Sequence, residues 1–168
     1  MAAVHYAYPW SRLIVQFKFH SRPDWARCLA TLLRSAPWVE PALELAQQVI
    51  PMPLSVERLR ARGYNQALEL ARCLAPDKIE GKLLLRIRET PAQSALARDA
   101  RMLNVRGAFA VEPLRHAELA GARVVLVDDV MTSGASMFSA AATLRQAGAA
   151  HITALVLARA DLGGHVPA

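Results

Sequence analysis

The sequence predicts an α/β fold in which a mostly parallel sheet is flanked by helices on both faces. Three observations favour this class. Wholly apolar runs such as Val124–Val127 are typical of strands buried on both faces. Such runs alternate with segments whose apolar residues recur at helical spacing, as in β–α–β units. The length of 168 residues fits one domain, and 54% hydrophobic with 20% charged residues exclude a disordered chain.

The first 45 residues are expected to be helical. Leu13, Ile14 and Phe17 fall on one helical face, and Asp24 can cap a second helix that runs to Arg34. The later patterns predict strands at 49–53, 83–87, 108–111, 123–127 and 152–158, and helices at 64–75 and 136–147.

The composition also bounds the setting of the protein. No run of 18 apolar residues occurs, so no membrane span is predicted. The start lacks the cationic and apolar regions of a signal peptide, and only 2 cysteines are present, so a reduced, cytoplasmic protein is expected. The oligomeric state is left open, with a homodimer as one option.

The segment from Val124 to Ser136 carries the strongest functional signal. A buried-type strand leads into Asp128 and Asp129, then into a loop of small hydroxyl residues around Gly134, and then into a helix. The N–H groups of such a loop and of the helix N-terminus can cradle a phosphate. The two carboxylates can accept hydrogen bonds from a vicinal diol and favour positive charge developing on a ribose ring.

This combination predicts a sugar-phosphate site with Asp128 and Asp129 as the catalytic candidates. The residues expected to hold the 5-phosphate are Met131, Thr132, Ser133, Gly134, Ala135 and Ser136. A Walker loop is excluded because no lysine follows the glycine. The alternative is that the acids and serines are ordinary caps of a β–α turn.

The segment resembles the signature with which type I phosphoribosyltransferases bind 5-phosphoribosyl-1-pyrophosphate (PRPP), an apolar run followed by Asp-Asp-x-x-Thr-(Ser/Thr)-Gly-x-(Ser/Thr). The rest of the chain resembles the competence protein F (ComF) family of predicted phosphoribosyltransferases over nearly its whole length. The stretches that carry this resemblance are Leu13-Ile14, Phe17-Lys18, Pro51-Met52-Pro53-Leu54, Arg58, Arg62-Gly63-Tyr64-Asn65-Gln66, Arg88, Thr90, Gln93, Arg101, Asn104 and Gly107-Ala108-Phe109.

The resemblance implies a type I phosphoribosyltransferase fold over residues 1–168, with a helical N-terminal part at 1–45. The PRPP-binding core at 46–168 would contain five parallel strands and a small hood with a loop at 88–106. The implied loop facing the pyrophosphate is Pro51, Met52, Pro53 and Leu54. Further implied ligand contacts are Arg62, Arg88, Thr90, Gln93, Arg101 and Asn104. Asn65 and Gln66 could either contact the ligand or satisfy the first turn of a helix.

The implied function is transfer of a phosphoribosyl group from PRPP to a small-molecule nitrogen acceptor, with release of pyrophosphate. Asp128 and Asp129 would hold the ribose hydroxyls, and Arg88 and Arg101 would neutralise the departing pyrophosphate. Mg²⁺ would be held mainly through PRPP. Many family members carry a four-cysteine zinc module, but this sequence has no Cys-x-x-Cys, so no metal site of its own is predicted.

The alternative function is a PRPP- or nucleotide-binding module without turnover that serves DNA uptake and competence. The net charge of +6 lies mostly on arginines before Val124 and suits phosphate groups in general. Phe17-Lys18-Phe19 alternates aromatic and cationic residues, as some single-stranded DNA sites do. Only weak, salt-sensitive contact with single-stranded DNA is expected.

Overall fold

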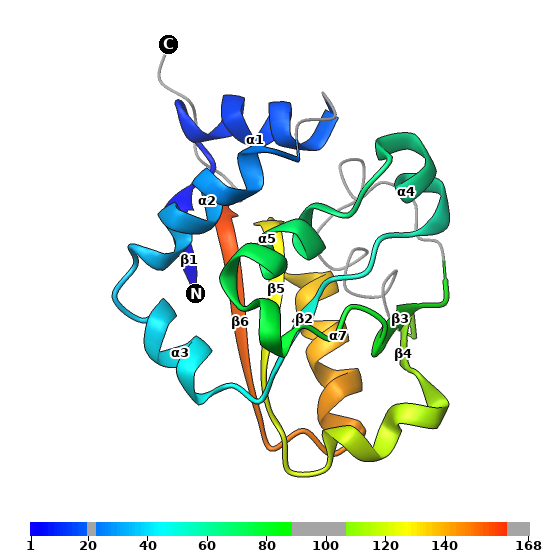
Figure 1. Cartoon of the computed structure of the whole chain (residues 1–168). Helices are drawn as coiled ribbons and strands as arrows, with labels where there is room; N and C mark the ends of the chain where they lie inside the picture. Colours follow the sequence, from blue (N-terminus) through cyan, green and yellow to red (C-terminus); the bar gives the residue numbers. More distant parts are fainter. Residues whose placement is uncertain (20–22, 89–106, 161–168) are drawn as a thin grey trace.

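The computed structural model describes residues 1–19, 23–88 and 107–160 (Figure 1). In chain order, its elements are β1 (Ala2–His5), α1 (Trp10–Phe19), α2 (Trp25–Arg34), α3 (Val39–Leu45), β2 (Gln48–Pro51), α4 (Val56–Arg62), α5 (Gln66–Leu74), η1 (Pro76–Lys78), β3 (Leu84–Arg86), β4 (Phe109–Val111), η3 (Pro113–Leu119), β5 (Arg123–Met131), α7 (Ala135–Gln146) and β6 (His151–Arg159).

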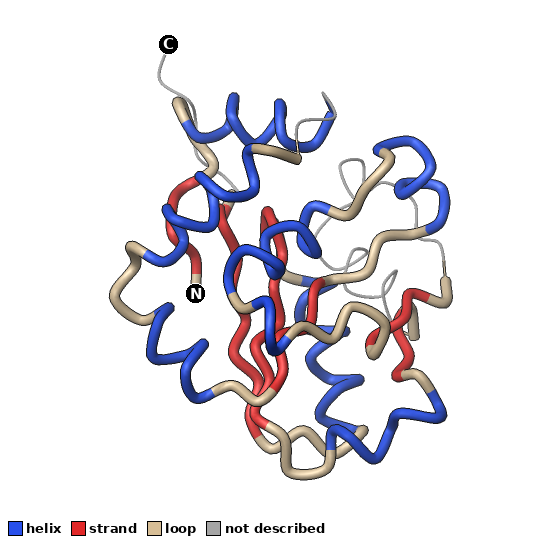
Figure 2. Tube along the Cα trace, viewed as in Figure 1, coloured by secondary structure: helices blue, strands red, loops and turns tan. Residues whose placement is uncertain are grey.

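A parallel sheet in the strand order β1-β6-β5-β2 forms the centre of the fold (Figure 2). Strands β3 and β4 form a separate antiparallel pair. Helix α7 covers one face of the sheet together with this pair, and α1, α2, α3 and α5 cover the other face. The predicted α/β class, a mostly parallel sheet flanked by helices, is therefore confirmed.

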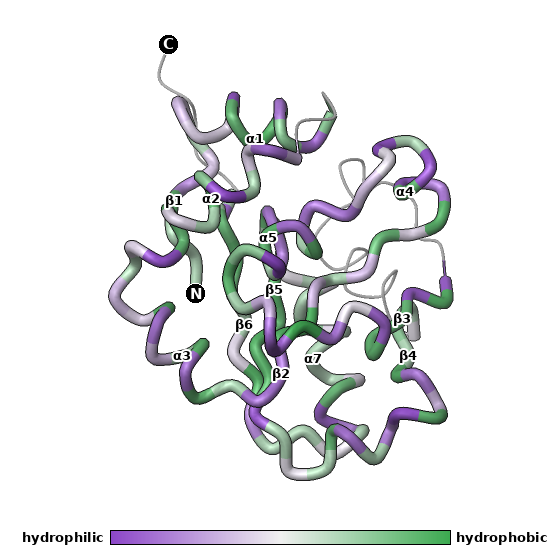
Figure 3. The backbone as a smooth tube through the Cα atoms, viewed as in Figure 1, coloured by the Kyte–Doolittle hydropathy of each residue, from purple (hydrophilic) through white to green (hydrophobic). Residues whose placement is uncertain are grey.

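The apolar run of β5 shows why this strand lies in the interior. Val124 and Leu126 belong to the core beneath α7, whereas Val125 and Val127 belong to the core beneath the other helices. Successive side chains of a strand point to opposite faces, so a run that is apolar at every position can bury both. The central strands are accordingly mostly in the hydrophobic colour in Figure 3.

Helix α5 follows its predicted spacing closely. Ala67, Leu70, Ala71 and Leu74 are all buried, and Leu70 is completely so. Burying a leucine side chain stabilises a fold by about 1.5–3 kcal/mol relative to exposing it. The helix thereby fixes the position of the segment that precedes it, which matters for the site described below.

Two expectations about strands were wrong. Residues 2–5 form an edge strand rather than part of a helix, because Val4 pairs with Ala158 and extends the ladder of β6. Within the described ranges the central sheet has four strands rather than five. On the outer edge of β2 the chain makes only an isolated parallel bridge, between Val49 and Ile79.

Three local features also differ from expectation. Strand β5 continues beyond residue 127 to Met131. Asp24 precedes α2, but its side chain makes no capping hydrogen bond. Helix α4 was not predicted; Ser55 caps it by accepting a hydrogen bond from the N–H of Arg58 at 3.3 Å, and none of its residues is buried. In the described part of the chain, no helix has the length and apolar content needed to span a bilayer.

Candidate functional site

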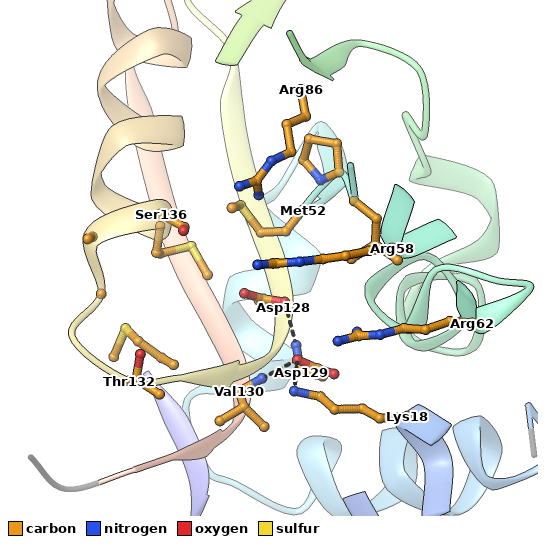
Figure 4. Close-up of a pocket in the computed structure, with 16 residues that line it drawn as sticks. Lys18, Met52, Arg58, Arg62, Arg86, Asp128, Asp129, Val130, Thr132 and Ser136 are labelled. Carbon is orange, nitrogen blue, oxygen red and sulfur yellow. Dashed lines mark hydrogen bonds and ion pairs between the residues drawn. The ribbon is translucent and has the colours of Figure 1, made fainter. Parts of the chain in front are cut away.

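A pocket of about 160 Å³ lies at the carboxyl ends of β5 and β2 (Figure 4), where ligands of parallel sheets commonly bind. Its lining comes from α1, α4, β3, β5, the loop that follows β2, the loop between β5 and α7, and the first turn of α7. The lining residues are Lys18, Met52, Pro53, Leu54, Arg58, Arg62, Arg86, Asp128, Asp129, Val130, Met131, Thr132, Gly134, Ala135, Ser136 and Met137.

Asp129 has one satisfied and one unsatisfied carboxylate oxygen. Its Oδ1 accepts a hydrogen bond from the N–H of Val130 at 2.6 Å and forms an ion pair with Lys18 Nζ at 3.0 Å. Its Oδ2 is buried and has no partner among the described residues. A buried oxygen without a donor is costly, so a hydrogen-bond donor from outside the described residues would stabilise this atom.

Asp128 lies beside it in an unfavourable environment for charge. Burial, and then the neighbouring Asp129 carboxylate, raise the pKa of Asp128 to about 7, although Lys18 and Arg62 act in the opposite direction. The Asp128 Oδ1 atom accepts a hydrogen bond from the N–H of Asp129 at 2.9 Å. Such a shift is typical of groups held in place for binding or catalysis.

Positive side chains face these acids across the pocket. Arg58 and Arg62 are four residues apart on α4, so they share a helical face, and Figure 4 shows both extending toward the two carboxylates. Arg62 also donates a hydrogen bond to Gln66 Oε1 at 2.9 Å, and its guanidinium lies 5.1 Å from the ring centroid of Phe19. Arg86 reaches the same pocket from β3.

The predicted phosphate loop connects β5 to α7. Gly134 has a φ of 78°, in the left-handed region that glycine adopts without strain. Thr132, Gly134 and Ser136 line the pocket, as does the first turn of α7. Ser133 does not line it, and its Oγ accepts a hydrogen bond from the N–H of Ala135 at 3.4 Å. This is a backbone arrangement suited to an anion at the start of a helix.

The structure brings most of the predicted residues together, but not all. Pro51 ends β2 and Arg88 follows β3, and neither lines the pocket. Asn65 accepts hydrogen bonds from the N–H groups of Ala67 and Leu68, so its side chain opens α5. Gln66 is buried against Arg62. The contacts of Asn65 fit the helix-opening alternative, whereas the side chain of Gln66 contacts Arg62 and the Tyr64 carbonyl instead. Thr90, Gln93, Arg101 and Asn104 lie outside the described residues.

Five pocket residues had no predicted site role: Lys18, Arg58, Arg86, Val130 and Met137. Lys18 and Arg58 stand in stretches that carry the family resemblance, but nothing local to either residue indicates a ligand. The four-residue spacing of Arg58 and Arg62 would have indicated two cations on one face, if the residues between them had been predicted as a helix.

Replacing Gly134 by alanine should distort the surrounding structure more than replacing Gly121, which lies before β5 and outside this loop. Both glycines have positive φ, which costs an alanine on the order of 1–2 kcal/mol. A Cβ at Gly134 would also lie 2.8 Å from the ring of Phe138, whereas one at Gly121 meets nothing within 4 Å.

We expect a lower melting temperature for both variants and weaker phosphate binding for Gly134→Ala alone. Thermal melts and phosphate titrations measure the two effects. Equal phosphate affinity of Gly134→Ala and wild type would contradict a role for this loop in anion binding.

Comparison with known proteins agrees with this geometry. Residues 44–165 match the model of the phosphoribosyl transferase domain family. The chain is 36% identical to Competence protein F of Haemophilus influenzae over 165 residues, covering 93% of this chain and 70% of that protein. It is 32% identical to the DNA utilization protein YhgH of Salmonella typhimurium over 161 residues, covering 92% and 69%.

Solved structures support the fold. A glutamine PRPP amidotransferase from B. subtilis superposes with a TM-score of 0.51 at 20% identity, covering 84% of this chain and 30% of that chain.

The Bacillus subtilis Competence protein ComFC is a further relative in sequence, 33% identical over 112 residues, covering 66% of this chain and 44% of that protein. With its matched domain and these relatives, the chain belongs to the ComF family of type I phosphoribosyltransferase-like proteins.

Proposed function

We propose that this protein binds PRPP and transfers its phosphoribosyl group to a nitrogen acceptor, with release of pyrophosphate. The observation that carries the proposal is the buried, unpartnered Oδ2 of Asp129 at a pocket bordered by the Gly134 loop and by cationic side chains. A ribose hydroxyl would donate to that oxygen, while the loop and the first turn of α7 hold the 5-phosphate.

The two ends of PRPP would then meet different parts of the pocket. The pyrophosphate would face Arg58 and Arg62 of α4 and the loop formed by Met52, Pro53 and Leu54. Guanidinium groups form paired hydrogen bonds with phosphate oxygens, so they stabilise the charge that builds up on the leaving group. As the bond to C1 of the ribose lengthens, Asp128 and Asp129 stabilise positive charge on the ring.

In this proposal Mg²⁺ would reach the site on PRPP. Among the described residues, no group of three or more His, Cys, Asp or Glu side chains could hold a metal ion. Mg²⁺ usually keeps several waters and binds through substrate phosphates with one or two carboxylates, so Asp128 and Asp129 are the side chains that would be available to it here. When bound, it would neutralise part of the pyrophosphate charge.

The acceptor class is inferred by analogy with the fold. Two relatives are named for competence or DNA utilization. We place the activity in the cytoplasm and in nucleotide metabolism that serves DNA uptake, with a nucleobase as the first acceptor class to test.

Binding of PRPP should stabilise the protein against heat. At a ligand concentration of 100 times Kd, binding adds about 2.7 kcal/mol of stability, or roughly 5–10 °C for a domain of this size. A thermal melt with PRPP and Mg²⁺ measures this shift, and guanosine without phosphate is the control. A pyrophosphate-release assay over nucleobases then tests turnover. An unchanged melting temperature with PRPP would contradict the proposed function. A higher melting temperature without pyrophosphate release would support PRPP binding but not the transfer reaction.

A further inference from the structure

The last turn of α1 reaches the candidate site, although it is far from β5 in sequence. The Tyr64 hydroxyl donates a hydrogen bond to the carbonyl of Phe17, and the two rings lie 5.9 Å apart between centroids. The guanidinium of Arg62 lies over the ring of Phe19. These contacts hold α1 against the segment between α4 and α5, with Lys18 directed at the pocket (Figure 4).

Lys18 acts on one oxygen of Asp129 and leaves the other available. Its ammonium group and the N–H of Val130 both hold Oδ1, at 3.0 and 2.6 Å. Rotation of the carboxylate would break both contacts, so Oδ2 stays in its buried position without a partner. One oxygen is thus used for anchoring and the other is kept for a donor that the described chain does not supply.

The ion pair between Lys18 and Asp129 is largely buried, so removing either partner should have a measurable effect. The Lys18 side chain is 17% exposed and that of Asp129 is 9% exposed. Ion pairs in open solvent contribute little, but removal of one partner from a shielded pair leaves an uncompensated charge. Lys18 is therefore suited to fixing the orientation of the Asp129 carboxylate.

We propose that Lys18 is a positioning residue of this site, which anchors Oδ1 of Asp129 so that Oδ2 can accept a hydrogen bond from a ribose hydroxyl. This inference rests on the proposed function, and it brings the N-terminal helical layer into the sugar subsite. It also gives Tyr64 a definite part, since this residue keeps the last turn of α1 in place.

Direct contact between Lys18 and a phosphate group is the competing explanation, and two ligands separate the two roles. Ribose 5-phosphate carries the hydroxyls but no pyrophosphate, whereas inorganic pyrophosphate carries no hydroxyls. A positioning role predicts that Lys18→Met weakens PRPP and ribose 5-phosphate by about tenfold, the loss of one hydrogen bond to a charged group. It predicts unchanged affinity for pyrophosphate.

Calorimetric titration of the full chain with PRPP, ribose 5-phosphate and pyrophosphate tests the proposal. The variants are Lys18→Met, Lys18→Arg, Asp129→Asn and the double variant Lys18→Met/Asp129→Asn. Lys82→Met, at an exposed lysine outside the pocket lining, is the matched control. We expect Lys18→Arg to retain most of the affinity, and the double variant to bind PRPP no more weakly than Asp129→Asn, because both changes remove the same interaction.

The outcomes separate this inference from the proposed function. If wild type binds no PRPP, the proposed function fails. If wild type binds PRPP and Lys18→Met binds it equally well, the positioning role is wrong and the proposed function stands. Weakened pyrophosphate binding in Lys18→Met, or additive losses in the double variant, would also overturn it. Should Lys18→Met not fold, Tyr64→Phe tests the same chain of contacts, and unchanged affinity for ribose 5-phosphate would then refute the proposal.

Discussion

Replacing Arg58 by alanine is expected to weaken PRPP binding by about tenfold to a hundredfold, whereas the same change at Arg60 should have no effect. The two residues are neighbours on α4 but lie on different faces of it. Arg58 lines the pocket, and Arg60 is exposed and does not. A hydrogen bond to a charged group contributes about 1.5–3 kcal/mol, which corresponds to the expected loss.

The double variant Arg58→Ala/Arg62→Ala should lose on the order of a hundredfold or more, if each arginine contacts the pyrophosphate. Titrations with pyrophosphate should show parallel losses, and ribose 5-phosphate should be affected much less. No residue of α4 is buried, so thermal melts of Arg58→Ala and Arg60→Ala should match wild type. Equal losses at Arg58 and Arg60 would mean that the general positive charge of α4, not a defined contact, attracts the ligand.

Replacing Asp128 by asparagine should make the protein more stable at pH 8 while weakening its binding of PRPP. The pKa of Asp128 is raised from 3.8 to about 7 by burial and by Asp129. Between these values the folded protein retains a proton that the unfolded chain releases, so wild-type stability falls as pH rises and stays reduced above about 7. Asparagine carries no charge and can still accept the hydrogen bond from the N–H of Asp129.

We expect Asp128→Asn to gain about 1–3 kcal/mol at pH 8, or roughly 3–10 °C in melting temperature, and little at pH 4. Melts across this pH range measure the difference. Asp77→Asn, at an exposed position in η1, is the control and should not change the profile. A lower melting temperature of Asp128→Asn at pH 8 would show instead that the pocket cations stabilise the charged form of Asp128.

The sequence was most informative where chemistry and secondary structure are local. The run from Val124 to Ser136 predicted a buried strand, a glycine turn and a helix, because each depends on neighbouring residues. The α/β class follows from the same kind of pattern and is confirmed. The implied roles of Arg88, Thr90, Gln93, Arg101 and Asn104 stay predictions.

Contacts between distant segments could not be predicted in this way. The pairing of Lys18 with Asp129 depends on how α1 packs over the sheet, and no local spacing encodes it. Helix α4 was missed because it buries no residue and so has no apolar periodicity to reveal it. The edge strand at Ala2–His5 is too short to show alternation and owes its conformation to β6.

The absence of buried residues in α4 also bears on how the site could change during evolution. Substitutions in a core are limited by the small margin of stability that natural proteins possess. Arg58 and Arg60 are free of that limit, since their side chains contribute to neither core, whereas Arg62 is also tied to Gln66 and Phe19. Drift at these positions can therefore alter which anionic group is accepted while the scaffold is preserved. A library that varies α4 while keeping Arg62 would explore new ligands with few unfolded members.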